Sequence, residues 1–390
     1  MNSQNVSTEH RLRPRGFDDS FLRQRLARRM RSGNVRSLTS PSGLIDFCSN
    51  DYLGLARSPE LRKRFDQELT QHYDDKIGAT GSRLLTGNSH FVEELESRIA
   101  AFHHAECGLI FNSGYDANLG LLSAVLGPED TLVYDEHVHA SIHDGMRLGR
   151  ARTYPFRHND LDHLERRLTR ASGRVFVAVE SVYSMDGDFA PLGELAELCD
   201  RYGCRLIVDE AHATGLFGKH GRGRVAECGC QPLTFARVHT FGKALGCHGA
   251  VVIGSETLRT HLINFARPLI YSTALPLHSL LAIKCSYDLL PHWQPAVTHL
   301  FELVEQFRAQ VCKCDGVECI DSRSAIQGLI LPGNQRVRQA AEALRRAGFD
   351  VRPIMSPTVK RGQERLRICL HAFNTPAEVT SRLNTLRASL

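Results

Sequence analysis

Apolar residues along the chain follow two spacings in turn, and this alternation predicts a layered α/β protein. From residue 89 onward, stretches with one apolar helical face are followed by short β-branched or apolar runs. The segments between these runs are long enough for crossover helices. Helices are expected at 89–102 and 117–126, and strands at 108–111, 131–134, 175–179, 205–208, 235–238 and 250–253. Such a pattern is typical of a mostly parallel central sheet with helices on both faces.

The pattern changes beyond Pro276, where the chain reads as helical through Phe307. After this stretch we expect a strand at 327–331, a helix at 335–347, strands at 351–354 and 366–370, and a closing helix at 376–386. This order predicts a smaller α+β domain. We therefore divide the chain into an N-terminal basic helical segment (1–45), a large domain (46–275) and a small C-terminal domain (276–390).

Length and composition fit a globular enzyme-sized protein. The 390 residues are 42% hydrophobic and 23% charged, which argues against a disordered or collagen-like chain. No run approaches the roughly 18 apolar residues of a membrane span, and the N-terminus has no apolar core resembling a signal peptide. We expect a cytoplasmic protein without a membrane partner.

The positive charge is concentrated at one end of the chain. Residues 1–36 contain nine arginines against three acidic residues, whereas the net charge of the whole chain is only +5. A basic end can meet nucleic acid, an import receptor or a phosphorylated substrate, or it can form a solvated helix face. Composition alone leaves these alternatives open.

The twelve cysteines do not indicate a disulfide scaffold or a metal centre. Such scaffolds belong to short secreted chains, and this chain is neither short nor apparently secreted. Cys228 and Cys230, and Cys312 and Cys314, are close in sequence, but no paired Cys-x-x-Cys elements are present. We expect reduced thiols and no metal.

Residues with chemical potential follow several of the expected strands, where ligands bind in such sheets. After 108–111, Asn112-Ser113-Gly114-Tyr115 forms a small polar turn that opens a helix, an arrangement suited to a phosphate. After 205–208 comes Asp209, a carboxylate that is costly to bury unless a cation or donors meet it. After 235–238 comes Lys243, an amine that can attack an aldehyde cofactor.

In this order, the phosphate turn, the aspartate and the lysine resemble the α-oxoamine synthases, which are fold-type I enzymes that use pyridoxal 5′-phosphate. The resemblance runs from about Phe21 to the C-terminus. Its motifs are SNDYLGL at 49–55, GSRLLTG at 81–87, FNSGY at 111–115, SMDGD at 184–188, VDEAH at 208–212, TFGKA at 240–244 and RLR at 365–367. The family implies a fold-type I transferase in which 46–275 binds the cofactor.

The resemblance implies catalytic roles for four residues. Lys243 would carry the cofactor covalently and later act as general base, and Asp209 would pair with the pyridinium nitrogen. For Asp209, the alternative is a helix N-cap. His139 would lie flat against the cofactor ring, with His137 as a competing candidate. His212 would hydrogen-bond the phenolic oxygen of the cofactor.

The resemblance also implies further cofactor contacts. Ser184 would join His212 at the phenolic oxygen. The phosphate or ring contacts would come from Ser113, Gly114, Tyr115 and Thr240, and from Ser272 and Thr273 of a neighbouring subunit. This last contact implies a homodimer, although both residues could simply form the turn before Pro276.

Family members condense an amino acid with an acyl thioester and release carbon dioxide, so the resemblance implies a carboxylate clamp. Arg367 matches the clamp and Asn50 assists it, because a planar guanidinium can hold a carboxylate through two bonds. We expect its neighbour Arg365 to be a surface or strand-edge charge. Arg36 and Arg83 match, more loosely, residues near the acyl substrate and the site entrance.

The motifs are most similar to the members that join L-alanine to a pimeloyl thioester in biotin synthesis, with coenzyme A or acyl carrier protein as the thioester carrier. A member that uses glycine, or one resembling serine palmitoyltransferase, is the main alternative. A non-catalytic protein with a nucleic-acid-binding N-terminus is a further alternative. Such a protein would have no chemical reason to keep Lys243, Asp209, His139 and Arg367 together, so we expect no nucleic-acid partner.

Overall fold

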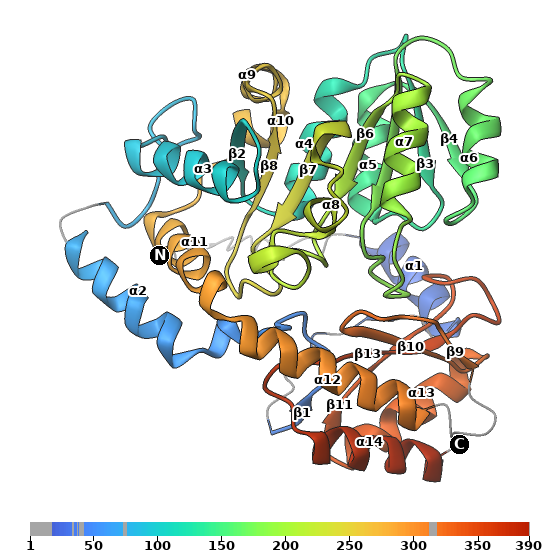
Figure 1. Ribbon diagram of the computed structural model, residues 1–390. Helices are drawn as coiled ribbons and strands as arrows, with labels where there is room; N and C mark the ends of the chain where they lie inside the picture. The colour runs from blue at the N-terminus through green and yellow to red at the C-terminus, as the bar shows by residue number, and fades with distance from the viewer. Residues whose placement is uncertain are drawn as a thin grey trace, which may run out of the picture.

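The computed structural model describes residues 18–32, 35–36, 38, 43–72, 76–311 and 318–389. Its largest sheet has seven strands, and the helices surround it on both sides (Figure 1). In sheet order the strands are β2 (Cys107–Phe111), β8 (Ala250–Gly254), β7 (Thr234–Thr240), β6 (Arg205–Asp209), β5 (Val175–Glu180), β3 (Thr131–Asp135) and β4 (Arg152–Phe156). Pairing is parallel from β7 to β4, whereas β8 runs antiparallel to both β7 and β2. The expected mostly parallel sheet is confirmed, with one reversed strand.

Two apolar cores lie on opposite faces of this sheet. Along β5, Phe176 and Ala178 point into one core, whereas Val177 and Val179 point into the other, as the two-residue period of a strand requires. The first core is covered by α4 (Gly114–Val125), α5 (Ala140–Gly149), α9 (Glu256–Phe265) and α10 (Arg267–Ile270). The second is covered by α6 (Leu161–Leu168), α7 (Leu192–Arg201) and α8 (Arg224–Glu227). Strands buried on both faces explain the continuous apolar runs in the sequence.

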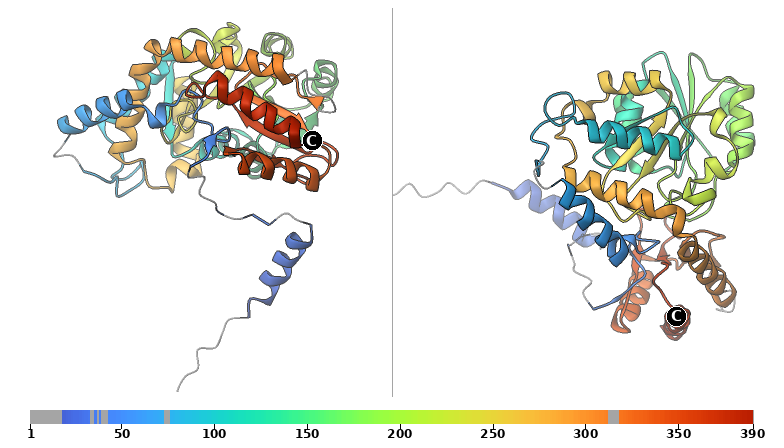
Figure 2. Two further views of the ribbon diagram at one scale, coloured as in Figure 1. Left: turned by 90° about the horizontal axis from the view of Figure 1, so that it is seen from below. Right: turned by 60° about the vertical axis from the view of Figure 1, so that its left-hand side comes forward.

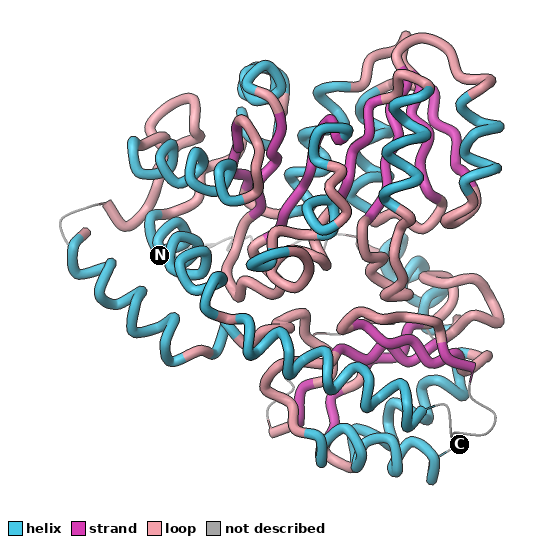
Figure 3. Tube along the Cα trace, viewed as in Figure 1, coloured by secondary structure: helices cyan, strands magenta, loops and turns pink. Residues whose placement is uncertain are grey.

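A second, antiparallel sheet forms the smaller unit below the large one (Figure 3). Its strands, in order, are β12 (Arg352–Ile354), β13 (Arg365–Cys369), β10 (Ile326–Ile330) and β9 (Glu318–Cys319). Helices α12 (Gln294–Val311), α13 (Asn334–Arg346) and α14 (Pro376–Ser389) belong to this unit. A short parallel pair, β1 (Ile45–Asp46) with β11 (Phe349–Asp350), joins residues from both ends of the chain. The boundaries at residues 45 and 275 stay a prediction.

The remaining helices connect or extend these units. Helices α2 (Pro59–Gln71), α3 (His90–Phe102) and α11 (Leu277–Leu289) flank the β2 side of the large sheet (Figure 1). The helical stretch expected from Pro276 to Phe307 is interrupted by a 3₁₀ turn, η4 (Leu290–His292), because Pro291 has no N–H to continue the helix. Further 3₁₀ turns are η1 (Leu55–Arg57), η2 (Lys219–Gly221) and η3 (Gln231–Leu233).

Helix α1 (Ser20–Arg31) has no buried residue and lies apart from both sheets (Figure 2). It carries five of the N-terminal arginines, and Phe21, Leu22, Leu26 and Met30 are exposed. Arg11, Arg13 and Arg15 lie outside the described residues, as do Cys312 and Cys314. Within the described part of the chain, no helix is long and apolar enough to cross a membrane.

Candidate active site

The carboxyl ends of β5, β6 and β7 bring the candidate residues to one edge of the large sheet. Asp209 ends β6 opposite Glu180, the last residue of β5, and Thr240 ends β7 three residues before Lys243. Parallel strands place their carboxyl ends at the same edge, so side chains far apart in sequence meet there. All four described side chains are at least half-buried.

Lys243 begins a chain of hydrogen bonds that reaches Asn50. Its Nζ lies 2.7 Å from His212 Nε2, and His212 Nδ1 lies 2.7 Å from the Tyr52 hydroxyl. That hydroxyl donates to Asn50 Oδ1 at 3.1 Å. Because a protonated amine can only donate, His212 accepts at Nε2 and carries its proton on Nδ1. The chain of bonds therefore sets the tautomer of His212.

Burial shifts the pKa of both nitrogen groups in this hydrogen-bond chain, the Lys243 amine and the His212 imidazole. Desolvation lowers the pKa of Lys243 to about 8, with Arg367 acting in the same direction and Asp209 and Glu180 opposing. Desolvation and the Lys243 charge hold the pKa of His212 well below its usual range. A neutral imidazole thus faces an amine that can gain or lose a proton near neutral pH.

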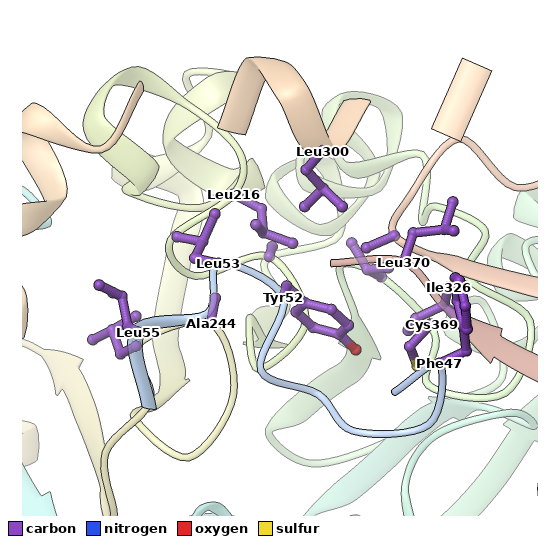
Figure 4. Packing of buried hydrophobic residues seen from close by; sticks show 14 of the residues in the cluster. Phe47, Tyr52, Leu53, Leu55, Leu216, Ala244, Leu300, Ile326, Cys369 and Leu370 are labelled. Atoms are coloured by element: carbon purple, nitrogen blue, oxygen red, sulfur yellow. The ribbon is translucent and has the colours of Figure 1, made fainter. Parts of the chain in front are cut away.

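Tyr52 connects this hydrogen-bond chain to the apolar core. Its ring is 1% exposed and lies in the cluster between Leu53 and Cys369 (Figure 4). Ala244, the neighbour of Lys243, belongs to the same cluster. A buried tyrosine hydroxyl needs a partner, and His212 and Asn50 supply two. The apolar packing of the ring therefore fixes the position of a polar hydroxyl.

Asp209 meets donors from two directions. Asn118 Nδ2, on α4, donates to Oδ2 at 2.7 Å, and the backbone N–H of Ala211 donates to Oδ1 at 2.8 Å. The second contact is a local turn of the kind that a capping aspartate makes, but the next α-helix of the chain, α8, begins only at Arg224. The helix-cap alternative therefore explains one oxygen of this carboxylate, and the other accepts from Asn118.

The two candidate histidines, His139 and His137, lie in different surroundings. His139 precedes α5, and its Nδ1 lies 2.8 Å from Ser141 Oγ, which in turn accepts from Asn118 Nδ2 at 3.0 Å. His139 is therefore linked to the partner of Asp209. His137 stacks on His158 with ring centroids 4.1 Å apart and lies 3.5 Å from Asp186. Of the two, only His139 joins the Asp209 network among the described residues.

Arg367 reaches the site from β13 of the small unit. Its Nε donates to the Ser184 carbonyl oxygen at 2.7 Å, and its Nη2 donates to Asn50 Oδ1 at 3.1 Å. Its Nη1 contacts Cys369 Sγ at 3.0 Å. Asn50 thus joins Arg367 to the hydrogen-bond chain that starts at Lys243. Asn50 is therefore the residue through which Arg367 and Lys243 belong to one hydrogen-bonded network.

Arg365 corrects our expectation of a surface or strand-edge charge. It is 5% exposed and pairs with Asp186 of the loop after β5. Residues two apart on a strand share a face, so Arg365 points to the same side of β13 as Arg367. Leu366 and Ile368, on the other side, pack into an apolar core that extends from the small unit to the large one. The pair therefore ties the small unit to the loop that contains Ser184.

Arg365→Ala should lower the free energy of unfolding by about 1.5–3 kcal/mol, because the partly buried Asp186 carboxylate loses its guanidinium partner and, among the described residues, keeps only His137 at 3.5 Å. Arg346→Ala is the control, since the Arg346 side chain is 78% exposed and its pair with Glu342 should contribute less than about 0.5 kcal/mol. Chemical denaturation of both variants measures the difference. Equal stabilities would show that the buried pair contributes nothing.

The phosphate turn lies at the amino end of α4. Ser113 caps this helix: its Oγ accepts from Asp116 N at 3.0 Å and donates to Asp116 Oδ2 at 2.8 Å. A Cβ on Gly114 would approach Thr240 Oγ1 to 3.4 Å, so the turn and the end of β7 are neighbours. The Tyr115 ring lies edge-on to His139, at 6.5 Å between centroids, and its hydroxyl bonds Asp144.

Three other predicted residues have separate surroundings. Arg83 donates to both oxygens of Glu96, at 2.6 and 3.2 Å, and to Asn88 Oδ1 at 2.7 Å. Thr273 is exposed, and its carbonyl oxygen accepts from Asn112 beside the phosphate turn at 2.8 Å. Arg36 is exposed in the segment after α1. Among the described residues, neither Arg83 nor Arg36 contacts the Lys243 cluster.

Three residues of this cluster were not among those predicted from sequence: Tyr52, Asn118 and Glu180. Tyr52 stands in the same motif as Asn50. Asn118 lies four residues after Gly114, hence on the same face of α4. Glu180 is the carboxylate that ends an apolar strand, the signal by which Asp209 was found. Each therefore had a local signal in the sequence.

The cluster offers the groups that pyridoxal 5′-phosphate needs. A helix amino end suits the phosphate, a carboxylate suits the ring nitrogen and an amine suits the aldehyde. Asn118 Oδ1, beside Asp209, is buried and has no hydrogen-bond partner among the described residues, which leaves an acceptor available there. No group of three or more His, Cys, Asp or Glu in the described ranges is arranged to hold a metal ion.

Comparison with known proteins places the chain in a family. The model of the aminotransferase class I and II family matches residues 42–386. An 8-amino-7-oxononanoate synthase of Emericella nidulans is 44% identical, with 96% of each chain covered. The synthase of that name from Marinobacter nauticus is 39% identical, covering 93% of this chain and 92% of its own.

Solved structures of two kinds share the fold. A serine palmitoyltransferase of Sphingomonas wittichii has a TM-score of 0.86 at 29% identity, covering 95% of this chain and 96% of its own. An 8-amino-7-oxononanoate synthase of Francisella tularensis has a TM-score of 0.76 at 28% identity, covering 88% and 97%. Shape alone does not separate the two activities, whereas the sequence identities favour the synthase.

Proposed function

Because the chain belongs to the aminotransferase class I and II family, and within it to the α-oxoamine synthases, we propose that it is an 8-amino-7-oxononanoate synthase. Such an enzyme joins L-alanine to a pimeloyl thioester and releases carbon dioxide and the free thiol, a step of biotin synthesis. The observation that carries the proposal is the continuous set of bonds from Lys243 through His212, Tyr52 and Asn50 to Arg367.

The cofactor of this family is pyridoxal 5′-phosphate, which supplies an electron sink for charge that develops at the amino-acid α-carbon. We assign its phosphate to the amino end of α4 at Ser113, Gly114 and Tyr115, together with Thr240. We assign its ring to Asp209 and His139, and its phenolic oxygen to Ser184 and His212. Thr273 of a second subunit would complete the phosphate contacts, which makes a homodimer part of the proposal.

Two side chains of the protein would act on alanine directly: Lys243 on its α-proton and Arg367 on its carboxylate. Lys243 Nζ, with its pKa lowered to about 8, would accept the α-proton of alanine, and neutral His212 at 2.7 Å would hold that amine in place. Arg367 would bind the alanine carboxylate, and Asn50 would keep the guanidinium aligned with the amine. The family role of Arg83 and Arg36 toward the acyl substrate stays a prediction.

Arg367→Lys should weaken the binding of L-alanine by roughly ten-fold to a hundred-fold, since a planar fork is replaced by a point charge and a charge-assisted hydrogen bond contributes on the order of 1.5–3 kcal/mol. Arg352→Lys is the control, because Arg352 lies opposite Arg367 in the sheet and pairs with Asp350. Titrating the visible absorbance of the loaded protein with L-alanine measures both affinities. Equal affinities would remove Arg367 from the carboxylate site.

A serine palmitoyltransferase-like activity is the second candidate, because structures of that enzyme share the fold at a TM-score of 0.86. Titration with L-alanine, glycine and L-serine separates the two. The proposal expects a spectral response to L-alanine at the lowest concentration. A preference for L-serine or glycine would contradict it. Pimeloyl-coenzyme A and pimeloyl-carrier protein, offered in turn, would then identify the thioester. We place the enzyme in the cytoplasm.

A further inference from the structure

Glu180 is a buried carboxyl at the candidate site to which the proposed function gives no role. It ends β5, lies opposite Asp209 in register and is 2% exposed. Two carboxyls side by side in a buried position are costly unless donors meet them. Its contacts therefore point to a task that outweighs this cost.

One oxygen of Glu180 accepts a hydrogen bond from the backbone N–H of a residue at the site. The backbone N–H of Ser184 donates to Glu180 Oε2 at 3.2 Å. The carbonyl oxygen of the same Ser184 accepts from Arg367 Nε at 2.7 Å. Glu180 is thus connected through Ser184 to the guanidinium at the proposed carboxylate site.

The Ser184 carbonyl controls the orientation of Arg367. Among the contacts of the guanidinium with Ser184, Asn50 and Cys369, Cys369 contributes a sulfur, which is a weak acceptor, and Asn50 is shared with Tyr52. The bond to Ser184 is the shortest of the three. A displacement of the Ser184 backbone would therefore move the carbonyl oxygen and rotate the Arg367 guanidinium away from its ligand. Misplacement by about 1 Å can cost as much as a hundred-fold in rate.

The charge state of Glu180 is compatible with this task. Burial, and next to it the charge of Asp209, raise the pKa of Glu180 well above its usual range. A protonated carboxyl still accepts a hydrogen bond through its carbonyl oxygen, and a glutamine side chain offers the same acceptor.

We propose that Glu180 is a positioning residue of the amino-acid carboxylate site: it holds the Ser184 backbone through its N–H, and the carbonyl oxygen on the other side of the same Cα orients Arg367. This inference rests on the proposed function. It predicts that the hydrogen-bond acceptor at position 180 matters for binding the amino acid, whereas the charge does not.

Two substitutions separate the acceptor from the rest of the side chain. Glu180→Gln keeps an acceptor oxygen, and Glu180→Met keeps length and volume without one. In the protein loaded with pyridoxal 5′-phosphate, Glu180→Met should weaken L-alanine binding about ten-fold, and Glu180→Gln should stay within about two-fold of wild type. Cofactor affinity, measured separately by equilibrium titration, should change little in both.

A double substitution tests whether the effect passes through Arg367. In an Arg367→Lys background, Glu180→Met should weaken alanine binding by less than about two-fold, because the oriented fork is already gone. A merely structural role would weaken binding equally in both backgrounds. Glu210→Gln is the matched control: Glu210 is equally buried just after β6, but it accepts from Ser181, Arg224 N and Val225 N instead. It should leave alanine affinity unchanged.

The outcomes distinguish this inference from the proposed function. A wild-type protein that loads the cofactor but shows no response to L-alanine would overturn the proposed function. If wild type responds and Glu180→Met binds alanine equally well, or Glu180→Gln is as weak as Glu180→Met, the positioning role is wrong. If Glu180→Met does not fold, Glu180→Asp replaces it, because the shorter side chain moves the acceptor oxygen back by one methylene. This variant should bind alanine several-fold more weakly than wild type. Wild-type affinity in Glu180→Asp would also contradict the positioning role of Glu180.

Discussion

Lys243→Ala should abolish covalent attachment of pyridoxal 5′-phosphate and reduce the rate of product formation by at least about a hundred-fold. The amine is the group at the site that can both attack the cofactor aldehyde and accept the α-proton, and a positioned base alone contributes roughly 10²–10⁴-fold. Borohydride reduction followed by peptide mass spectrometry measures the attachment. Wild type should gain the cofactor mass on the peptide containing Lys243, and the variant should gain none.

Lys284→Ala is the control for this substitution. Lys284, on α11, is partly buried and pairs with Glu68 and Asp288, away from the strand ends. Its removal should change neither the attachment nor the yellow colour of the loaded protein. Modification of a lysine other than Lys243, or a wild-type protein that stays colourless with added cofactor, would contradict the assignment.

Asp209→Asn should keep the cofactor bound and lose most exchange of the alanine α-proton. The amide oxygen can still accept from the N–H of Ala211, whereas the NH2 group then faces the Nδ2 donor of Asn118. The neutral amide no longer holds the ring nitrogen protonated. Deuterium uptake at the α-carbon of L-alanine, followed by NMR in heavy water, measures the loss.

Asp130→Asn provides the comparison for Asp209→Asn. Asp130 is fully buried and pairs with Arg174, but it precedes β3 and so lies at the opposite end of the parallel strands. This substitution should lower stability and leave exchange per folded molecule unchanged. Unaltered exchange in Asp209→Asn would show that Asp209 serves only the local turn.

The parts of the fold predictable from sequence are those that a repeating pattern specifies. Buried strands such as β5 and β6 read as apolar runs, and their carboxyl ends locate Asp209 because ligands bind at that edge. The edge strand β4 was missed because most of it is exposed and it contains Pro155. The reversed direction of β8 was also invisible, since an apolar run has no direction.

The site could be predicted only where one residue's chemistry stood out. Burying a charged side chain such as Lys243 or Asp209 beside a strand end costs free energy, so each residue could be singled out as a candidate from its own position in the sequence. Arg365 was misjudged because the sequence does not reveal which loop faces β13, and that loop supplies Asp186. The link from Tyr52 to His212 joins residues 160 positions apart, and only the folded chain brings them together.

The most direct test of the proposed function follows the carboxyl carbon of L-alanine through the reaction and asks whether its release depends on Lys243. Purified protein with pyridoxal 5′-phosphate, pimeloyl thioester and L-alanine labelled with ¹³C at the carboxyl group is analysed by mass spectrometry. The account predicts labelled carbon dioxide and unlabelled 8-amino-7-oxononanoate in equal amounts, and neither from Lys243→Ala. Product that retains the label, or carbon dioxide released only with glycine or L-serine, would contradict it.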